Sequence, residues 1–403
     1  MKLFYYKDRE RPICYYNTDK QVEIPETFKL KPFRGMWVSN VANIDLPILE
    51  DEKSYKEKIN RMLEVAKSFN INAILFQVRT TNDAFYESKL NPYSRYLTGQ
   101  EGKKPLFDVL KYVIDEAKKY NIEIHAWANP YRVSLNGIIK QEDYIKTCDP
   151  LNFAIKHNEF VILNKEGQMI LNPAKEEVRQ HIIDSMIEIV RNYEVAGIHF
   201  DDYFYPYQGL DESCNDLKDY EQREDKKMSL GDFRRHQVDL VIKGVHDALK
   251  KENPKIRFGV SPFGIWRNNT NDACGSNNGP GATESYENQY ANSYKWVKEG
   301  YCDYIVPQLY WEFGHKIAPF ADLCDWWQNL CKDSNVDLYI GHGAYRLGQE
   351  GEYENPLEIT NQVTYANQYD TVKGNVFFTY KTFIDEDKNR LGMCELKKLF
   401  GGK

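Results

Sequence analysis

The feature that most constrains the fold of this chain is an alternation, repeated eight times, between short apolar runs and longer segments of helical periodicity. This alternation is typical of parallel strands joined by helical crossovers. The predicted strands span Arg34–Ser39, Ala73–Arg79, Glu123–Ala128, Gly197–Asp201, Arg257–Ser261, Tyr304–Leu309, Leu338–Gly341 and Asn375–Thr379.

The clearest predicted helix is segment 54–70, in which Ile59, Met62, Leu63 and Ala66 recur at helical spacing beneath a Lys/Glu face. Further helices are predicted over Leu106–Lys119, Glu176–Tyr193, Leu230–Lys251, Asn288–Lys298, Ala321–Lys332 and Leu357–Tyr369.

Because no break in composition separates these βα units, they predict one closed (β/α)8 TIM barrel with long βα loops over residues 33–403. An N-terminal extension, residues 1–32, is expected to pack on this barrel. A doubly wound sheet is the less favoured alternative.

Composition narrows the classes of partner. The net charge of -7 and the absence of a Lys/Arg block interleaved with aromatic residues argue against a nucleic-acid partner. We expect no membrane span, because no apolar run is long enough, and no signal peptide is recognised at the N-terminus. The chain as written reads as cytoplasmic, although an exported mature form would read the same. The 29 Tyr and 7 Trp residues suit stacking against sugar rings.

Polar and aromatic clusters follow most of the predicted strands. They are HAWANPYR, HFDDYFYP, SPFGIWRN, PQLYWE and GHGAY. The active site of a parallel barrel forms at the carboxyl ends of its strands, so these clusters are expected to meet there. The opposite ends carry Asn72, Glu123 and Asp303, which we interpret as structural.

Several of these blocks resemble the glycosyl-hydrolase-like family ten, which is distinct from the xylanase family of similar name. The resemblance rests on FRGMWVSNV, FQVRTTNDAFY, NPYSRYLTG, HAWANPYR, GIHFDDYFYP, GVSPFGIWRN, PQLYW and LYIGHGAY, in order from Phe33 to Tyr345. It implies a (β/α)8 barrel and a glycosidase acting on a carbohydrate substrate. Since a bacterial member of that family cuts peptidoglycan strands stripped of their peptides, such strands are the first substrate hypothesis.

An acidic pair, Asp201 and Asp202, ends the fourth predicted strand, and glycosidic cleavage normally needs two carboxyl groups. Successive strand side chains point to opposite faces, so one of the two needs a partner elsewhere. Glu312 is the preferred partner and Asp83 the second choice. We expect His199, which shares the parity of Asp201, to hold that carboxylate, and Asp202 to face the substrate. Helix capping is the structural alternative for this pair, but the aromatic run YFYP follows it and not a helix.

The predicted catalytic residues are therefore Asp202, Asp201 and Glu312. Residues predicted to bind substrate lie at or near the strand ends. They are Arg79, Asp83, His125, Asn129, Tyr131, Arg132, His199, Tyr203, Trp266, Gln308, Tyr310, Trp311, His342 and Tyr345.

Alternative roles stay open for several of these residues. An arginine at a strand end fits an ion pair with the Asp pair as well as a sugar contact. Among the large aromatics, Trp266 and Trp311 are expected in the cleft, whereas Trp127 is expected in the core.

Two other function classes fit the same residues. A metal-dependent barrel hydrolase or deacetylase would use His125, His199, Asp201, Asp202 and His342 as ligands, although no compact metal motif is present. A non-catalytic carbohydrate-binding barrel would use the acids only as hydrogen-bond acceptors. The prediction is a glycoside hydrolase without cofactor or metal.

Overall fold

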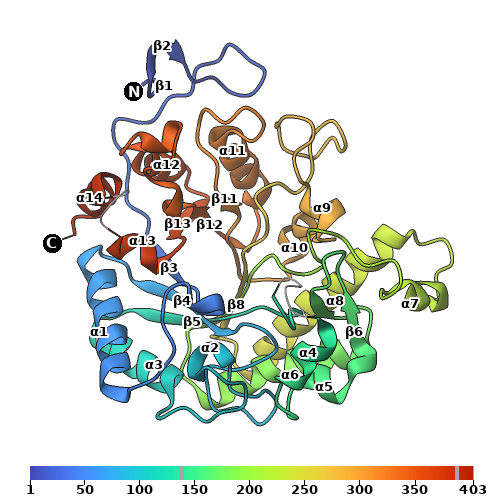
Figure 1. Cartoon of the computed structure of the whole chain (residues 1–403). Helices are drawn as coiled ribbons and strands as arrows, with labels where there is room; N and C mark the ends of the chain where they lie inside the picture. Colours follow the sequence, from blue (N-terminus) through green and yellow to red (C-terminus); the bar gives the residue numbers. More distant parts are fainter. Residues whose placement is uncertain (136–139, 386–389, 403) are drawn as a thin grey trace.

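A computed structural model describes residues 1–135, 140–385 and 390–402. Across these residues, parallel strands close into the eight-position barrel that the sequence predicts, with helices around it (Figure 1). The strands follow the order β3–β4–β5–β8–β9–β10/β11–β12–β13, and β13 pairs with β3 to complete the ring. They span Phe33–Val38 (β3), Ala73–Arg79 (β4), Glu123–Ala128 (β5), Gly197–Phe200 (β8), Arg257–Val260 (β9), Tyr304–Ile305 (β10), Gln308–Leu309 (β11), Asp337–His342 (β12) and Val372–Phe377 (β13).

The sixth barrel position differs from the prediction because it holds two short strands, β10 and β11, rather than one. Pro307 lies between them, and proline has no backbone N–H to donate to the sheet. The eighth strand also begins earlier than predicted, since Val372 pairs with Leu338 and Gly374 pairs with Phe33.

Several helices begin where a side-chain cap satisfies one of their first N–H groups. Asp51 accepts from the N–H of Ser54 at 2.7 Å, and Asp108 accepts from the N–H of Lys111 at 3.0 Å. Where the sequence predicts one helix over Asn288–Lys298, the structure has two, α9 (Ser285–Asn288) and α10 (Ser293–Glu299). The helices that follow the barrel strands are α1 (Glu52–Ser68), α2 (Arg95–Thr98), α3 (Val109–Lys119), α6 (Glu176–Asn192), α8 (Leu230–Glu252), α9 (Ser285–Asn288), α10 (Ser293–Glu299), α11 (Phe320–Cys331), α12 (Glu358–Asn367), α13 (Tyr380–Ile384) and α14 (Arg390–Leu399).

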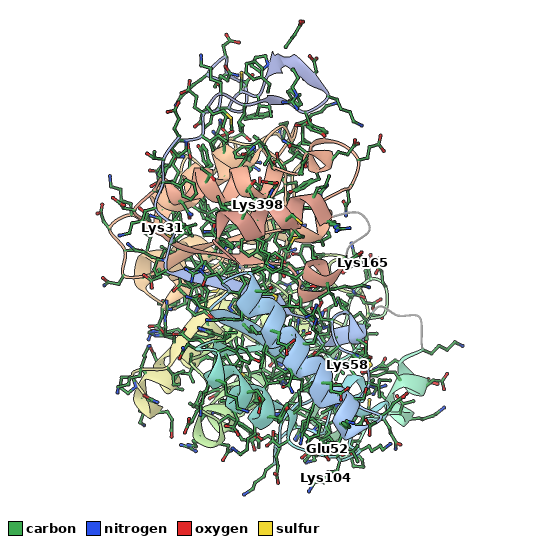
Figure 2. All side chains as sticks on the ribbon, turned by 90° about the vertical axis from the view of Figure 1, so that its left-hand side faces the viewer. Lys31, Glu52, Lys58, Lys104, Lys165 and Lys398 are labelled. Carbon is green, nitrogen blue, oxygen red and sulfur yellow. The ribbon has the colours of Figure 1, made fainter. Side chains whose placement is uncertain are left out.

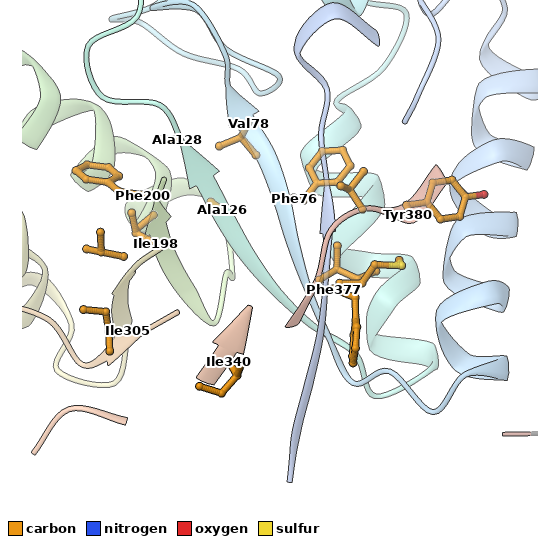
Figure 3. Packing of buried hydrophobic residues seen from close by; sticks show 14 of the residues in the cluster. Phe76, Val78, Ala126, Ala128, Ile198, Phe200, Ile305, Ile340, Phe377 and Tyr380 are labelled. Atoms are coloured by element: carbon orange, nitrogen blue, oxygen red, sulfur yellow. The ribbon is translucent and has the colours of Figure 1, made fainter. Parts of the chain in front are cut away.

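Two separate apolar clusters stabilise the barrel, because successive strand residues face opposite sides of the sheet. One fills the space between the strands and the helices (Figure 3), and includes Phe76, Ile198, Phe200, Ile340 and Phe377. The other fills the barrel interior and consists of Phe33, Trp37, Ala73, Leu75, Trp127, Tyr304, Val306, Tyr339 and Val376.

The first residues form an antiparallel hairpin of β1 (Phe4–Tyr5) and β2 (Asp8–Pro12), which lies beside α11 and α12 (Figure 1). The Tyr6 N–H donates to the Glu352 carboxylate at 3.0 Å, and the Tyr16 N–H donates to Asp322 at 3.0 Å. These bonds attach the segment to the outside of the barrel.

Two βα loops are long and carry their own elements. The loop after β5 holds α4 (Gln141–Lys146), α5 (Phe153–Lys156), the 3-10 turn η2 (Asn158–Phe160) and a hairpin of β6 (Val161–Leu163) and β7 (Met169–Leu171). The loop after β8 holds α7 (Leu217–Gln222). Other short 3-10 turns are η1 (Val41–Asn43), η3 (Ala344–Arg346) and η4 (Glu352–Glu354).

Charged side chains such as Lys58 on α1 and Lys398 on α14 stand on the outer surface (Figure 2). A search of the described residues for a helix of enough length and apolarity to cross a membrane finds none.

Candidate active site

A cavity of about 440 Å³ opens at the carboxyl ends of the barrel strands, and we call it the cleft. Its volume falls within the usual range for small-ligand sites. Its walls combine aromatic rings with a few polar groups. The lining residues are Trp37, Ser39, Val41, Ile44, Trp127, Arg132, Asp201, Asp202, Tyr203, Tyr207, Ser261, Phe263, Gln308, Tyr310, Trp311, Tyr345, Arg346 and Phe378.

Strand β8 determines where Asp201 lies. Gly197 is required at the start of this strand, because a Cβ there would lie 2.5 Å from the carbonyl oxygen of Arg257. Strand alternation then directs Asp201 inward, towards β5. Since Trp127 pairs with His199 in the parallel register, Asn129 and Asp201 follow as neighbours at the strand ends.

Three N–H donors hold the Asp201 carboxylate. Trp127 Nε1 donates to Oδ2 at 3.1 Å, Asn129 Nδ2 lies 3.1 Å from Oδ2 and 3.2 Å from Oδ1, and the backbone N–H of Tyr203 donates to Oδ1 at 3.2 Å. Two of the donors belong to β5 or the residue after it. The carboxylate is therefore fixed in orientation by the neighbouring strand.

Asp202 has a different environment, although it is the next residue. The hydroxyl of Tyr207 donates to its Oδ2, and the side chain of Gln308 also forms a hydrogen bond with it. Gln308 is itself held by a bond from its Nε2 to the carbonyl oxygen of Ser261 at 2.9 Å. Asp202 thus contacts groups from its own loop and from β11.

Burial raises the pKa of both carboxyls. For Asp202, burial comes first and repulsion by Asp201 second, and together they raise its pKa to about 6 against hydrogen bonds from Tyr207 and Gln308 that lower it. Burial also raises the pKa of Asp201, opposed by Arg132 and by the three N–H donors. Among the described residues neither carboxylate forms an ion pair within 4 Å. The pair can therefore hold a proton near neutral pH, and Asp202 holds it more readily.

Aromatic rings form much of the cleft wall. Tyr203 and Tyr345 are 41% and 46% exposed at the rim. Trp311 packs edge-on against Phe263 with ring centroids 5.3 Å apart. Exposed aromatic faces of this kind suit the apolar faces of sugar rings.

Arg132 supplies a cationic group to the same cavity. Its Nε donates to the carbonyl oxygen of Thr80 at 3.0 Å, and its guanidinium lies 4.9 Å from the ring centroid of Tyr203. Its two terminal nitrogens donate to no other group in the part of the chain that the structure describes. They are available to an anionic substituent of a ligand.

The structure brings eight of the seventeen predicted site residues to the cleft. They are Asp201, Asp202, Arg132, Tyr203, Gln308, Tyr310, Trp311 and Tyr345.

Glu312, the preferred partner carboxylate, does not line the cleft. It lies close enough to Glu352 and Glu358 to raise the pKa of both by repulsion, although burial is the larger cause for each. At this bend Trp311 faces the cleft and the next side chain turns away from it. The sequence-based placement of Glu312 opposite the Asp pair is therefore wrong.

Four other predicted residues lie behind the cleft wall. Arg79 is fully buried and donates to the carbonyl oxygens of Asn129 and Pro130 at 2.7 and 2.9 Å. Asp83 accepts from the backbone and hydroxyl groups of Thr80 and Thr81, so it closes a turn. Tyr131 is also buried, and Asn129 reaches the site only through Asp201. None of the four lines the cleft; Arg79 and Asp83 support the loop backbone, and Asn129 holds Asp201.

The predicted histidines do not reach the cleft either. His125 Nδ1 bonds the hydroxyl of Tyr304 at 2.8 Å inside the barrel. His199 bonds Ser261 Oγ at 2.9 Å, and does not hold Asp201 as predicted. His342 is fully buried between Gln362 and Asn375. These histidines lie in the barrel interior and its wall, where side-chain hydrogen bonds hold their rings away from the cleft.

The five residues of the metal alternative therefore do not converge. A search of the described residues finds no group of three or more His, Cys, Asp or Glu side chains that could hold a metal ion. Burial lowers the pKa of His199 well below its usual value, with a smaller contribution from His125. Its neutral ring is consistent with a hydrogen-bonding role in the core.

Two tryptophans lie in environments opposite to those predicted from the sequence. Trp266 is 5% exposed and stacks on Tyr294 and Trp326 with centroids 4.8 and 6.0 Å apart, so it packs beneath its loop and not in the cleft. Trp127 is equally buried but lines the cleft and donates to Asp201. Burial alone does not separate core from site here.

Sequence reasoning missed further lining residues. Tyr207 follows the Asp pair in the run HFDDYFYPY, and Arg346 follows Tyr345, so both signals lay beside selected residues. Phe263 and Phe378 lie just beyond β9 and β13, so their position after a strand end could have identified them as lining residues.

Comparison with known sequences gives a consistent result. A family model described as glycosyl hydrolase-like 10 matches residues 32–357. The glycosyl hydrolase YngK of Bacillus subtilis (strain 168) is 36% identical over 368 residues, which cover 90% of this chain and 70% of that protein. The glycosyl hydrolase DigH of Escherichia coli (strain K12) is 29% identical over 390 residues, covering 92% of this chain and 88% of DigH.

Solved structures show the same barrel at low sequence identity. The catalytic domain of β-amylase from Paenibacillus polymyxa superposes with a TM-score of 0.56 at 13% identity, covering 93% of this chain and 99% of that one. An endo-1,4-β-mannanase from Rhizomucor miehei gives 0.53 at 12% identity, covering 97% and 100%. At these identities the likeness concerns the fold.

Proposed function

The chain belongs to the glycosyl hydrolase-like 10 family and is a glycoside hydrolase, and we propose that it cleaves glycosidic bonds in peptide-free peptidoglycan strands with Asp202 as the proton donor. The observation that carries the proposal is the position of Asp202, a buried acid with no ion pair among the described residues, in an aromatic-lined cleft at the carboxyl ends of the barrel strands.

The catalytic roles follow from the two environments in the pair. A general acid must hold a proton at the working pH, and the pKa of Asp202, raised to about 6 mainly by burial, allows this. The hydroxyl of Tyr207 and the amide of Gln308 orient it towards the cleft. When a glycosidic oxygen lies against it, Asp202 gives up its proton as the C–O bond breaks, and then accepts a proton from the attacking water.

Arg132 supports the choice of peptide-free strands. The lactyl group of muramic acid carries a free carboxylate when no peptide is attached, whereas an attached peptide converts it to a neutral amide. Arg132 lines the cleft, and its terminal nitrogens have no hydrogen-bond partner among the described residues. A guanidinium in this position favours the carboxylate over the amide.

Product analysis tests the proposal. The protein is incubated with peptide-free strands, intact peptidoglycan, chitin oligomers, β-glucan and β-mannan, and new reducing ends are identified by mass spectrometry. We expect cleavage of the peptide-free strands, no cleavage by Asp202→Asn, and a lower rate on intact peptidoglycan. Cleavage of glucan or mannan in preference to the strands would contradict the proposal.

The role of Arg132 has its own test with matched substrates. Arg132→Gln keeps a hydrogen-bonding side chain but removes the charge. We expect KM on peptide-free strands to rise by about ten- to a hundredfold, since a charge-assisted bond contributes on the order of 1.5–3 kcal/mol. On chitin oligomers, which lack lactyl groups, the variant should match the wild type. An equal loss on both substrates would show that Arg132 only supports the loop.

A further inference from the structure

The carboxyl groups of the cleft come from one point of the barrel. Of the described residues that line it, Asp201 and Asp202 alone carry carboxyl groups. The usual two-acid mechanism places a second carboxyl across the scissile bond, about 5–5.5 Å away in retaining and 6.5–9.5 Å in inverting enzymes. Glu312, the partner preferred from the sequence, lies outside the cleft. Asp201 would therefore have to be the second group, and its contacts decide what it can do.

The contacts of Asp201 suit a carboxylate that accepts a hydrogen bond from a ligand N–H. It accepts from Trp127 Nε1, Asn129 Nδ2 and the N–H of Tyr203. A carboxylate has about four acceptor positions, so three donors leave one for a ligand N–H. Both oxygens of Asp201 already accept hydrogen bonds from Trp127, Asn129 or Tyr203, so a covalent bond from either oxygen to the anomeric carbon would weaken the bonds that fix this side chain.

The surroundings of the pair suit a small substituent with a polar and an apolar end. Trp37, Trp127 and Tyr310 line the same cavity as the carboxyls. Trp37 is 2% exposed and Trp127 is 5% exposed, so both rings belong to a rigid floor. A methyl group can rest on such rings while an adjacent N–H donates to Asp201.

We propose that the nucleophile is the 2-acetamido group of the substrate itself, held by Asp201, so that the enzyme requires an N-acetylated hexosamine on the non-reducing side of the cleaved bond. The inference rests on the proposed function and specifies its mechanism. Substrate-assisted hydrolysis of this type is one of the known exceptions to the two-carboxylate scheme.

The acetamido carbonyl oxygen forms a bond to the anomeric carbon, and the bond from that carbon to the glycosidic oxygen breaks. The glycosidic oxygen takes the electron pair and the Asp202 proton. The positive charge of the resulting cyclic oxazolinium ion lies beside the Asp201 carboxylate, which accepts its N–H. Water then bonds to the anomeric carbon and gives its proton to Asp202, and the amide is restored with retained configuration.

The test compares peptide-free glycan strands that differ only in their acetamido groups. One portion is left N-acetylated, a second is chemically de-N-acetylated, and a third is de-N-acetylated and then acetylated again. We expect the second portion to be cleaved at least about a hundredfold more slowly, because an intramolecular nucleophile is lost, and the third to recover. Equal cleavage of the first two would overturn the inference and leave the proposed function intact. Cleavage of acetamido-free polysaccharides alone would overturn both.

Variants separate a holding role for Asp201 from a nucleophilic one. Asp201→Asn should lower kcat on N-acetylated strands by about a hundredfold and reduce the preference over de-N-acetylated strands, while Asp303→Asn, far from the cleft, should change neither. Asp201→Gly with added azide gives the opposite test. Formation of a glycosyl azide with recovered activity would identify Asp201 as the nucleophile and overturn the inference.

Inhibition gives an independent measurement. The thiazoline of N-acetylglucosamine is a stable analogue of the cyclic ion, so it should inhibit the wild type competitively and bind Asp201→Asn at least tenfold more weakly. Absence of inhibition at concentrations equal to the substrate KM would contradict the mechanism.

Discussion

Acidic residues at the two ends of the barrel have pKa values shifted in opposite directions. At the amino ends of the strands, Asp303 lies 2.7 Å from Lys250 Nζ and accepts from the N–H of Phe258 at 2.7 Å. Although burial alone would raise its pKa, bonds from His246, Lys250 and Phe258 lower it. At the carboxyl ends, Asp202 has hydroxyl and amide donors, no ion pair among the described residues, and a pKa raised to about 6 by burial and Asp201.

This difference in partners explains why aspartates at the two ends of the barrel have different roles. A carboxyl that pairs with a cation, as Asp303 does with Lys250, stays ionised and ties elements together. At the same rim Asp337 lies 2.8 Å from Arg257. A carboxyl buried with neutral donors can carry a proton. Burial and the charge of the partners together separate structural from chemical roles here, because Asp202 is fully buried among neutral donors whereas Asp303 is half-buried beside a cation.

Replacing one acid at each end should give the largest difference in activity. Asp202→Asn is expected to lower kcat by about 10²–10⁴-fold, the usual contribution of a general acid. Asp303→Asn should retain kcat within about twofold, since it lies at the opposite rim. Initial rates on peptide-free strands measure both. Comparable losses in the two variants would refute the division between the ends.

The pH dependence of kcat/KM should reflect Asp202. Because the acid must be protonated to act, activity should be highest below its pKa and fall about tenfold per pH unit above about 6. The profile is measured on the free enzyme at low substrate concentration. A descending limb that begins above pH 8 would mean that another group donates the proton.

The same two variants should change stability in opposite directions. The folded-state pKa of Asp202 is raised, so its contribution to stability is present at low pH and lost as pH rises through about 6. Asp202→Asn should therefore raise the free energy of unfolding by about 1–3 kcal/mol at pH 8, with a smaller gain at pH 5.

The folded-state pKa of Asp303 is lowered, so its contribution is present above its ordinary value and lost as pH falls. Asp303→Asn should accordingly reduce the free energy of unfolding by about 1–2 kcal/mol at pH 7, and by less at pH 4. Denaturant unfolding checks both variants. Changes of the same sign at neutral and higher pH would contradict the comparison.

The smallest effect is expected from Glu312→Gln. Glu312 follows a cleft residue in sequence but lies with Glu352 and Glu358 behind the wall. Its loss should leave kcat within about threefold, because no proton transfer passes through it. A loss comparable to that of Asp202→Asn would restore Glu312 as the second carboxylate.

Much of the fold could be predicted from the sequence. β4 and β5 have the predicted bounds, because their apolar runs are continuous and end at polar residues. The sixth strand was less predictable, since apolar periodicity does not show that Pro307 divides it. The start of β13 depends on pairing with β12 and β3, which are distant in sequence.

The site could be predicted in part, for a related reason. Position after a strand end placed Asp201, Asp202 and Tyr310 at the cleft correctly. It failed for Trp266 and Glu312, because residues beyond a strand follow the local course of the loop rather than strand alternation. Packing against Trp326 decides the side chain of Trp266.

The alternation of strands and helices and the inward parity of Asp201 can be read from the sequence, because both follow from local periodicity and backbone geometry. Which groups meet the Asp pair depends on packing between distant parts of the chain. Trp127, Asn129 and Tyr203 fix Asp201, and Gln308 reaches Asp202 from a strand more than a hundred residues away. Burial and donor identity, which govern protonation, are products of that packing.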